Sequence, residues 1–265
     1  MTGGIMRSFI KRYFKTLLFF ALIGIIGGFF TGLYMLDSYP AEIKQELISE
    51  LAAAGIAGIP VDIFIGILTA LQSAGYGAVL GALGIFFGKK TGLWRDERSI
   101  TKKPLIVAVI ISASCGLLLI LPDAFIFGRF SEAILASYAT KPSIPFILAS
   151  VTYGAVIEEV MLRLFFMSLV AFLLHKLLDR KSETPTVPVL VLANIVSSLL
   201  FAIGHLPATE MLLGLTPMII ARCIILNGAI GLLFGFLYRK YGLRYAMIAH
   251  GGCHVVSKLI WLLFI

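Results

Sequence analysis

The stretch IPFILASVTYGAVIEEVMLRLFFMSLVAFLLH, residues 144–175, decides the class of this protein. Its only formally charged side chains are Glu158, Glu159 and Arg163. A helix needs about 20 residues to cross the hydrocarbon core of a bilayer, so this run is long enough to do so. Charged groups are costly in hydrocarbon and are kept there for function or for pairing. The stretch therefore predicts a membrane-spanning helix whose charges have a purpose.

The apolar character extends over the whole chain. Hydrophobic residues make up 59% of it and charged residues 14%, whereas a soluble domain carries roughly 25% charged residues. We expect an all-α fold, a polytopic membrane helix bundle of about seven transmembrane helices, with an amphipathic helix at residues 41–57. The expected spans are residues 16–36, 63–87, 105–127, 144–175, 188–206, 216–238 and 243–264.

The basic residues indicate a topology. The formal net charge is +8, and Lys and Arg divide 16 to 3 between alternate connections when the N-terminal segment, residues 88–104, 176–187 and 239–244 are set against the others. Cytoplasmic loops carry such an excess. We therefore expect a multi-pass protein of the cell membrane, with a cytoplasmic N-terminus and an extracytoplasmic C-terminus. The same distribution explains the basicity without nucleic acid, so we expect membrane lipids as partners and no nucleic acid.

The charges of the opening stretch divide by helical spacing. Glu159 and Arg163 are four residues apart on one helix face, with the acid on the favourable N-terminal side. Glu158 points about 100° away and has no evident local partner. We therefore expect Glu159 to be neutralised and Glu158 to be free to take a proton from water. The alternative is a structural ion pair plus one protonated Glu that holds helices together.

Three of the four histidines lie in or at the end of expected spans. His205 closes the fifth span, in FAIGHLP, where a protonated imidazole at a helix C-terminus is an alternative explanation. His250 and His254 are four apart in AHGGCHVVSK, the spacing with which one helix offers two imidazoles to a metal. Interhelical hydrogen bonding is the alternative for this pair. Two Glu and three His on three spans form the inventory of a hydrolytic site.

These motifs resemble those of a known family. EEVMLR (Glu158, Glu159, Arg163) matches the pattern EExxxR, FAIGH (Phe201, His205) matches FxxxH, and His250 matches the first position of a third motif. The chain resembles the CAAX-protease and bacteriocin-processing (CPBP, or Abi) intramembrane proteases, relatives of the Ras-converting CAAX endopeptidase, over about residues 145–260. We accordingly expect an N-terminal transmembrane region at residues 1–140 and a catalytic core of four spans at residues 141–265.

The resemblance implies intramembrane hydrolysis of a peptide bond. Glu158 would activate the water, and Glu159 with Arg163 would support the site. His205 and His250 would position the water, stabilise the oxyanion or bind a metal. The implied partner is a membrane-associated peptide or protein, prenylated or carrying a leader. A catalytically silent relative acting as an adaptor, a chaperone or a bacteriocin self-immunity factor is the alternative function, and a proton-coupled transporter is a third.

Two departures from the family pattern stand out. Leu162 and Leu164 flank Arg163 where Phe and Gly are common, which should alter packing more than chemistry. His254 stands where Asn or Asp is usual, and it either supplies a third imidazole or weakens the site. A Zn²⁺ held by His205, His250 and His254 and a metal-free glutamate mechanism both stay open.

The depths of the motifs are in tension. Counted from the cytoplasmic side, His205 lies about 26 Å along its helix from Pro188, whereas His250 lies only about 9 Å along its helix from Arg244. Helix tilt, or a fifth span that begins well below the membrane surface, must close this gap, because the hypothesis requires Glu158, His205 and His250 to converge on one cavity.

Overall fold

The computed structural model describes residues 2–56, 58–96 and 99–265, with side chains from residue 7 onward. Every regular element in this part of the chain is helical, so the predicted all-α bundle is confirmed. The α-helices are α1 (Thr2–Asp37), α2 (Ala41–Ala53), α3 (Val61–Gly75), α4 (Gly81–Thr91), α5 (Lys102–Phe125), α6 (Glu132–Ser137), α7 (Ile144–Ala149), α8 (Ser168–Leu178), α9 (Val187–Gly204), α10 (Leu206–Leu213), α11 (Pro217–Tyr241) and α12 (Leu243–Phe264). Three segments wind as π-helices, η1 (Tyr76–Leu80), η3 (Ser150–Glu158) and η4 (Val160–Met167), and η2 (Phe127–Arg129) is a 3₁₀ turn.

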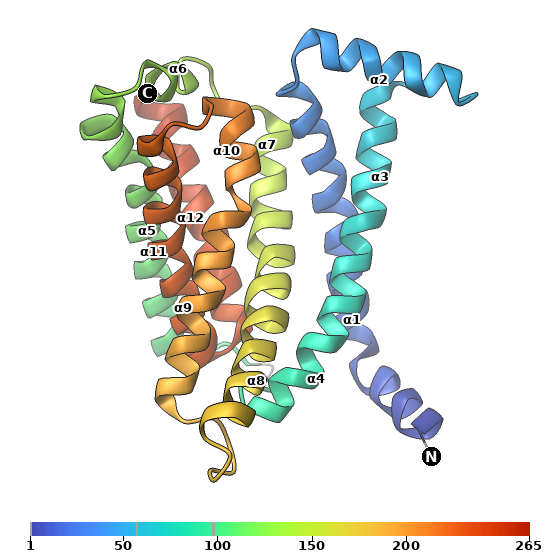
Figure 1. The fold of residues 1–265 in the computed structure, drawn as a ribbon, viewed down its shortest axis with the longest axis vertical. Helices are drawn as coiled ribbons and strands as arrows, with labels where there is room; N and C mark the ends of the chain where they lie inside the picture. The colour runs from blue at the N-terminus through green and yellow to red at the C-terminus, as the bar shows by residue number, and fades with distance from the viewer. Residues whose placement is uncertain (1, 57, 97–98) are drawn as a thin grey trace.

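Six stretches of the described chain are long and apolar enough to cross a bilayer: Arg7–Asp37, Val61–Thr91, Lys102–Arg129, Val187–Leu213, Pro217–Tyr241 and Leu243–Phe264. The seventh predicted span is the helical run from α7 through η3 and η4 to α8, which extends along the bundle from one end to the other (Figure 1). The protein is therefore a multi-pass membrane protein.

The two termini lie at opposite ends of the bundle (Figure 1). We call the end with the N-terminus and the connection between α8 and α9 the basal end, and the end with α2 and α6 the distal end. The predicted amphipathic helix is α2, which lies across the distal end and buries none of its residues. The last residue of that prediction, Ala57, and one counted basic residue, Arg98, lie outside the described residues.

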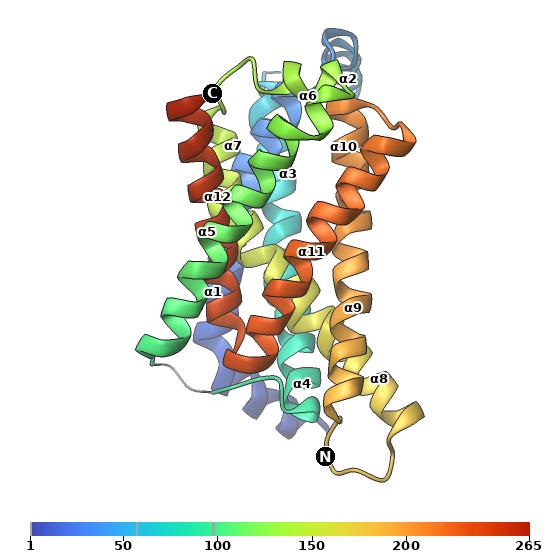
Figure 2. The same cartoon turned by 90° about the vertical axis from the view of Figure 1, so that its left-hand side faces the viewer.

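The run from α7 to α8 occupies the centre of the bundle. Its η3 part packs against α1 and α12, and its η4 part packs against α4, α9 and α11. Around it, α12 runs beside α5 and α11 beside α9 (Figure 2). Helices from both halves of the chain thus share one bundle, and the division of roles between residues 1–140 and 141–265 stays a prediction.

Small residues allow the helices to approach closely. A methyl group at Gly28 of α1 would lie 2.4 Å from the carbonyl oxygen of Thr69 in α3. A methyl group at Gly235 of α11 would lie 1.7 Å from Asn194 Oδ1 in α9. The contact at Gly28 is with backbone, so glycine is required there for helix packing. A methyl group at Gly235 would instead displace the Asn194 side chain.

The fifth span extends further than predicted. The sequence places its end at residue 206 because Pro207 follows, but helix α10 begins at once and continues the span to Leu213. Pro207 stands in the first turn of α10, where the missing backbone N–H costs no hydrogen bond. His205 therefore lies at the junction of two helices within the span and not at its end.

Candidate active site

The two adjacent carboxylates lie at the junction of η3 and η4 and face the same imidazole. His250 Nδ1 is 3.0 Å from Glu159 Oε1, and His250 Nε2 is 3.9 Å from Glu158 Oε2. Helical spacing directs the two side chains about 100° apart. An imidazole presents its two nitrogens in different directions, so one ring on α12 meets both side chains.

The two carboxylates nevertheless differ. Glu159 is completely buried and hydrogen-bonded, whereas 22% of the Glu158 side chain is exposed. The distance from Glu158 to His250 is too long for a direct hydrogen bond. Glu158 is therefore the carboxylate that a water or a substrate can reach.

Arg163 forms the predicted ion pair with Glu159, at 3.4 Å between Nη1 and Oε1. Its Nη2 donates to the carbonyl oxygen of Gly231, and its guanidinium lies 4.4 Å from the centre of the Phe201 ring. Gly231 permits this approach, because a methyl group there would lie 3.2 Å from Nη2. The buried cation is thus held by one carboxylate, one carbonyl and one aromatic face.

This cluster keeps unused hydrogen-bonding capacity. Within the described chain, Glu159 Oε2 and Arg163 Nη1 are buried without a hydrogen-bond partner. Nη1 is near enough to Glu159 for an ion pair but is not aligned for a hydrogen bond. Buried polar atoms are almost always paired in folded proteins, so such exceptions call for an explanation, and function is one.

The ring of His250 is fixed by its neighbours. It stacks on Phe234 with 4.6 Å between ring centres, and the Phe201 ring lies 5.8 Å away at a steep angle. Because a carboxylate can only accept, Nδ1 of His250 must carry the proton of its bond to Glu159. Nε2 then faces Glu158 in a defined orientation.

His205 approaches this cluster through Phe201. Its ring lies edge-on to Phe201 at 4.5 Å, and its Nδ1 is 2.8 Å from the Phe201 carbonyl oxygen. In the described residues, no hydrogen bond or ion pair joins His205 to Glu158 or His250. The structure thus brings Glu158 and His250 together, while His205 stands behind one aromatic ring, and its role stays a prediction.

His254 lies one turn after His250, with 5.0 Å between the ring centres. Lys258 Nζ is 3.4 Å from His254 Nδ1 and 4.1 Å from the centre of the Phe146 ring. Lys258 is only 6% exposed. It is a polar neighbour of the site that sequence reasoning missed, although its spacing of four from His254 was a usable signal.

Gly154 of η3 provides room beside the two histidines. A methyl group there would lie 3.3 Å from His254 Nε2 and 3.8 Å from His250 Nε2. The absence of a side chain at Gly154 thus avoids a close contact with both imidazoles. The sequence motifs do not include this glycine.

The predicted zinc ligands do not form a ligand set. No group of three or more His, Cys, Asp or Glu side chains in the described ranges is gathered closely enough to hold a metal ion. Nδ1 of His205 and Nδ1 of His254 also have partners of their own, the Phe201 carbonyl and Lys258. The described residues as arranged do not fit a three-histidine zinc site. Zn²⁺ stays a prediction.

Comparison with known proteins supplies an independent finding. Residues 140–256 match the family model described as "Type II CAAX prenyl endopeptidase Rce1-like". Searches of curated proteins and of solved structures found no match. The matched residues contain Glu158, Glu159, Arg163, His205, His250 and His254, and the matching family is one of proteases. Residues 140–256 of this membrane protein are thus similar to the Rce1-like type II CAAX prenyl endopeptidases.

Proposed function

We propose that this chain is an intramembrane endopeptidase that hydrolyses a peptide bond of a membrane-associated substrate, prenylated or carrying a leader. The observation that carries the proposal is the facing pair of Glu158 Oε2 and His250 Nε2, 3.9 Å apart. One water oxygen can contact both groups across this distance. The match of residues 140–256 to a protease family supports the same conclusion.

In the proposed reaction Glu158 is the general base. Its carboxylate takes a proton from the water as the water oxygen attacks the carbonyl carbon of the substrate. The tetrahedral intermediate then collapses as its C–N bond breaks, and the proton on Glu158 passes to the leaving amine. The products are a peptide with a new carboxyl end and a peptide with a new amino end.

His250 orients the water through Nε2, and Glu159 with Arg163 holds the ring in place through Nδ1. His254 presents Nε2 near the same opening beside Gly154, where it can donate to the developing oxyanion. Its partner Lys258 donates to Nδ1, which leaves the proton of His254 on Nε2. In this arrangement His254, at the position where Asn or Asp is usual, can still donate a hydrogen bond to the oxyanion.

A Glu158→Gln variant tests the proposal. The protein would be reconstituted in vesicles with a farnesylated peptide and a matched unmodified peptide, and the products identified by mass spectrometry. We expect kcat to fall by about 10³-fold, in the range of a lost general base, with an unchanged thermal unfolding midpoint. Glu210→Gln, which alters an exposed carboxylate on α10, should retain full activity.

The same variant separates the enzyme from a silent relative. If an adaptor or immunity phenotype survives Glu158→Gln, hydrolysis is not the function of the protein. Membrane-associated peptides that accumulate in cells carrying the variant would reveal the substrate. Elemental analysis of the purified protein, with activity measured before and after chelation, tests the zinc prediction.

We also propose that the basal end faces the cytoplasm. The described parts of residues 88–104 and 176–187, which carry eight Lys and Arg residues, lie at that end together with the N-terminus. The three native cysteines are buried, so an introduced cysteine can be labelled selectively. An impermeant maleimide should label Ser49→Cys from outside intact cells and Thr184→Cys only after lysis. The reverse pattern would contradict the orientation.

A further inference from the structure

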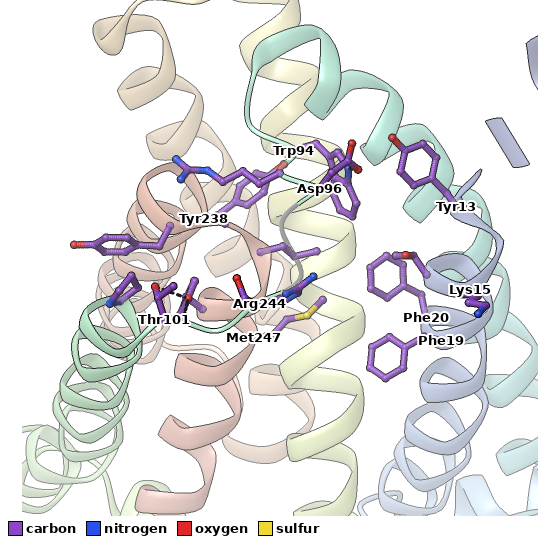
Figure 3. Close-up of a pocket in the computed structure, with 18 of the residues that line it drawn as sticks. Tyr13, Lys15, Phe19, Phe20, Trp94, Asp96, Thr101, Tyr238, Arg244 and Met247 are labelled. Atoms are coloured by element: carbon purple, nitrogen blue, oxygen red, sulfur yellow. Dashed lines mark hydrogen bonds between the residues drawn. The ribbon is translucent and has the colours of Figure 1, made fainter. Parts of the chain in front are cut away.

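A cavity of about 570 Å³ lies at the basal end, away from the candidate active site. We call it the basal cavity. It is formed by α1, the segment before α5 and the turn between α11 and α12, and Figure 3 shows side chains of α1 facing those of α12 across it. The residues that carry the argument are Phe19, Phe20, Arg95, Asp96, Arg244 and Met247. Neither Glu158 nor His250 lines it.

The cavity has an excess of positive charge. Four of its described lining residues are cationic and one, Asp96, is acidic. Asp96 is already bound, because Arg12 donates to it at 2.9 Å and the Trp94 indole at 2.8 Å. The cavity therefore holds cationic groups that this carboxylate does not neutralise.

Arg95 and Arg244 are the two guanidinium groups in question. Arg95 donates to the backbone carbonyl of Arg239, and Arg244 makes no side-chain hydrogen bond in the described residues. Neither has a carboxylate partner within that part of the chain. Figure 3 shows Arg244 reaching into the space beside Met247. Guanidinium groups recognise phosphate by paired, charge-assisted hydrogen bonds.

The other wall of the cavity is apolar. Figure 3 shows the rings of Phe19 and Phe20 directed from α1 toward Met247. Phe19 is 49% exposed on a helix that crosses the membrane. A ligand here meets cations at one side and hydrocarbon-like surface at the other, the pattern of the headgroup region of a bilayer.

We propose that the basal cavity binds the phosphate group of an anionic phospholipid, with the lipid chains along Phe19, Phe20 and Met247. Phosphate is the chemistry that the guanidinium groups select, and the apolar wall favours a lipid over a free phosphate compound. Basic pockets between transmembrane helices suit such headgroups, and the volume is that of a small-molecule site. This site is independent of the protease chemistry.

The test is native mass spectrometry of the full chain in neutral detergent, titrated with phosphatidylglycerol or phosphatidylcholine. We expect a preference of about tenfold or more for phosphatidylglycerol. Arg95→Gln with Arg244→Gln should abolish the preference, whereas Arg180→Gln with Lys181→Gln, two exposed cations at the same end, should keep it. Glu158→Gln should also keep it, which separates this proposal from the proposed peptidase.

Three outcomes would overturn the proposal. The first is equal binding of the two lipids, and the second is an equal loss in both double variants, which would indicate unspecific attraction to a basic surface. The third is displacement of phosphatidylglycerol by glycerol 3-phosphate at equal concentration, which would replace the lipid by a free phosphate compound. A charge-preserving Arg95→Lys, Arg244→Lys pair that binds lipid excludes misfolding as the cause of a loss.

Discussion

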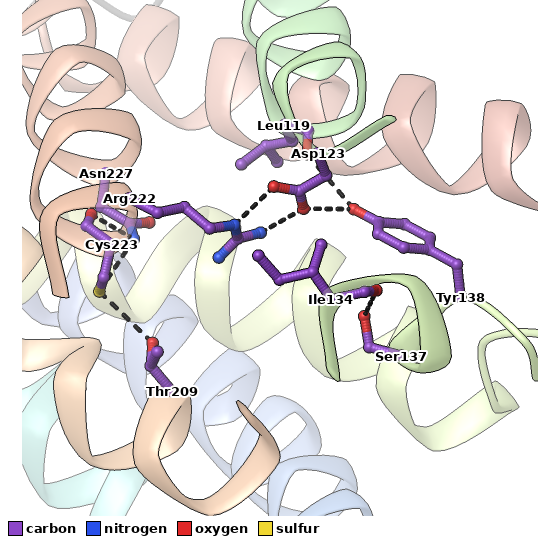
Figure 4. A network of polar contacts seen from close by, with 9 residues as sticks. All are labelled: Leu119, Asp123, Ile134, Ser137, Tyr138, Thr209, Arg222, Cys223 and Asn227. Atoms are coloured by element: carbon purple, nitrogen blue, oxygen red, sulfur yellow. Dashed lines mark hydrogen bonds and ion pairs between the residues drawn. The ribbon is translucent and has the colours of Figure 1, made fainter. Parts of the chain in front are cut away.

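The molecule contains two buried ionic clusters that are built in opposite ways. The distal cluster joins Asp123 of α5, Arg222 of α11 and Tyr138 (Figure 4). Both oxygens of Asp123 accept from the Arg222 guanidinium, and the Tyr138 hydroxyl donates to one of them at 2.8 Å. In the central cluster, Glu159 Oε2 and Arg163 Nη1 have no hydrogen-bond partner in the described chain.

The difference teaches how buried charges are used in this protein. A carboxylate whose oxygens are both bound can only hold helices together, and the distal cluster ties α5 to α11 and to the segment after α6. In the central cluster, the unpaired acceptor Glu159 Oε2 and the unpaired donor Arg163 Nη1 lie near the partly exposed Glu158. Buried polar groups without hydrogen-bond partners lower the stability of a fold, but an active site needs such groups to orient water and substrate.

The largest combined loss of activity and stability should follow from Glu159→Gln. This change removes the anion that orients His250 and leaves the guanidinium of Arg163, 1% exposed, without its countercharge. We expect kcat to fall by about 10²-fold or more, and the free energy of unfolding to fall by about 3–5 kcal/mol. Activity in vesicles and thermal unfolding in detergent measure the two effects. A variant with lost activity and unchanged stability would show that Arg163 needs no countercharge.

Asp123→Asn should separate stability from activity. Its loss leaves Arg222 without a countercharge, but Arg222 is 17% exposed and can reach water. We therefore expect a loss of about 3 kcal/mol in stability, the lower end for a broken buried pair. The kcat of the protein that remains folded should stay within about twofold of wild type. A large drop in kcat at a temperature where the variant is folded would indicate that the two clusters act as one functional unit.

Gly154→Ala should act on the central cluster alone. The added methyl group would lie 3.3 Å from His254 Nε2 and 3.8 Å from His250 Nε2, so it narrows the space for water and substrate. We expect kcat to fall by about tenfold from a small displacement of the reacting groups, with stability nearly unchanged. Gly228→Ala is the matched control, since its methyl group would lie 4.0 Å from Ala202 Cβ. Equal effects of the two variants would argue against an opening at Gly154.

Local sequence patterns predict two of the features compared here, the helix bundle and the Glu159–Arg163 pair. Hydropathy was sufficient for the bundle, because helices in a bilayer must be apolar over their whole length. The Glu159–Arg163 pair follows from a spacing of four residues, which places two side chains on one face. These features depend only on neighbours in sequence or on the solvent around the chain.

The remaining features depend on tertiary packing. The contact of Glu159 with His250 joins residues 91 positions apart, and no periodicity encodes it. The sequence assumed α-helical geometry for residues 144–175, and the π-helical winding of η3 and η4 has no signal in the apolar pattern. Lys258 is buried, and the ring of Phe146, which is far from it in sequence, packs against its ammonium group. The sequence pattern does not predict this contact.

The smallest effect on stability concerns Asp96, which forms an exposed ion pair with Arg12. Its bond from the Trp94 indole, aided by the charge of Arg12, holds the pKa of Asp96 below its usual range. A lowered pKa in the folded state stabilises the protein above the unfolded value of about 3.9, and this stability is lost as the pH falls through the lower, folded pKa. Because the Asp96 side chain is 49% exposed, solvent screening limits the contribution to under about 1 kcal/mol.

Asp96→Asn should therefore lower the unfolding midpoint slightly at pH 6, and by less as the pH falls below about 3.9. High salt should reduce the difference at pH 6, because exposed charges are screened, whereas the loss in Asp123→Asn should persist in salt. The measurement is thermal unfolding of both variants beside wild type at low and high ionic strength. If salt weakened both effects alike, the distal cluster would be as open to water as Asp96, and its contrast with the central cluster would rest on geometry and not on burial.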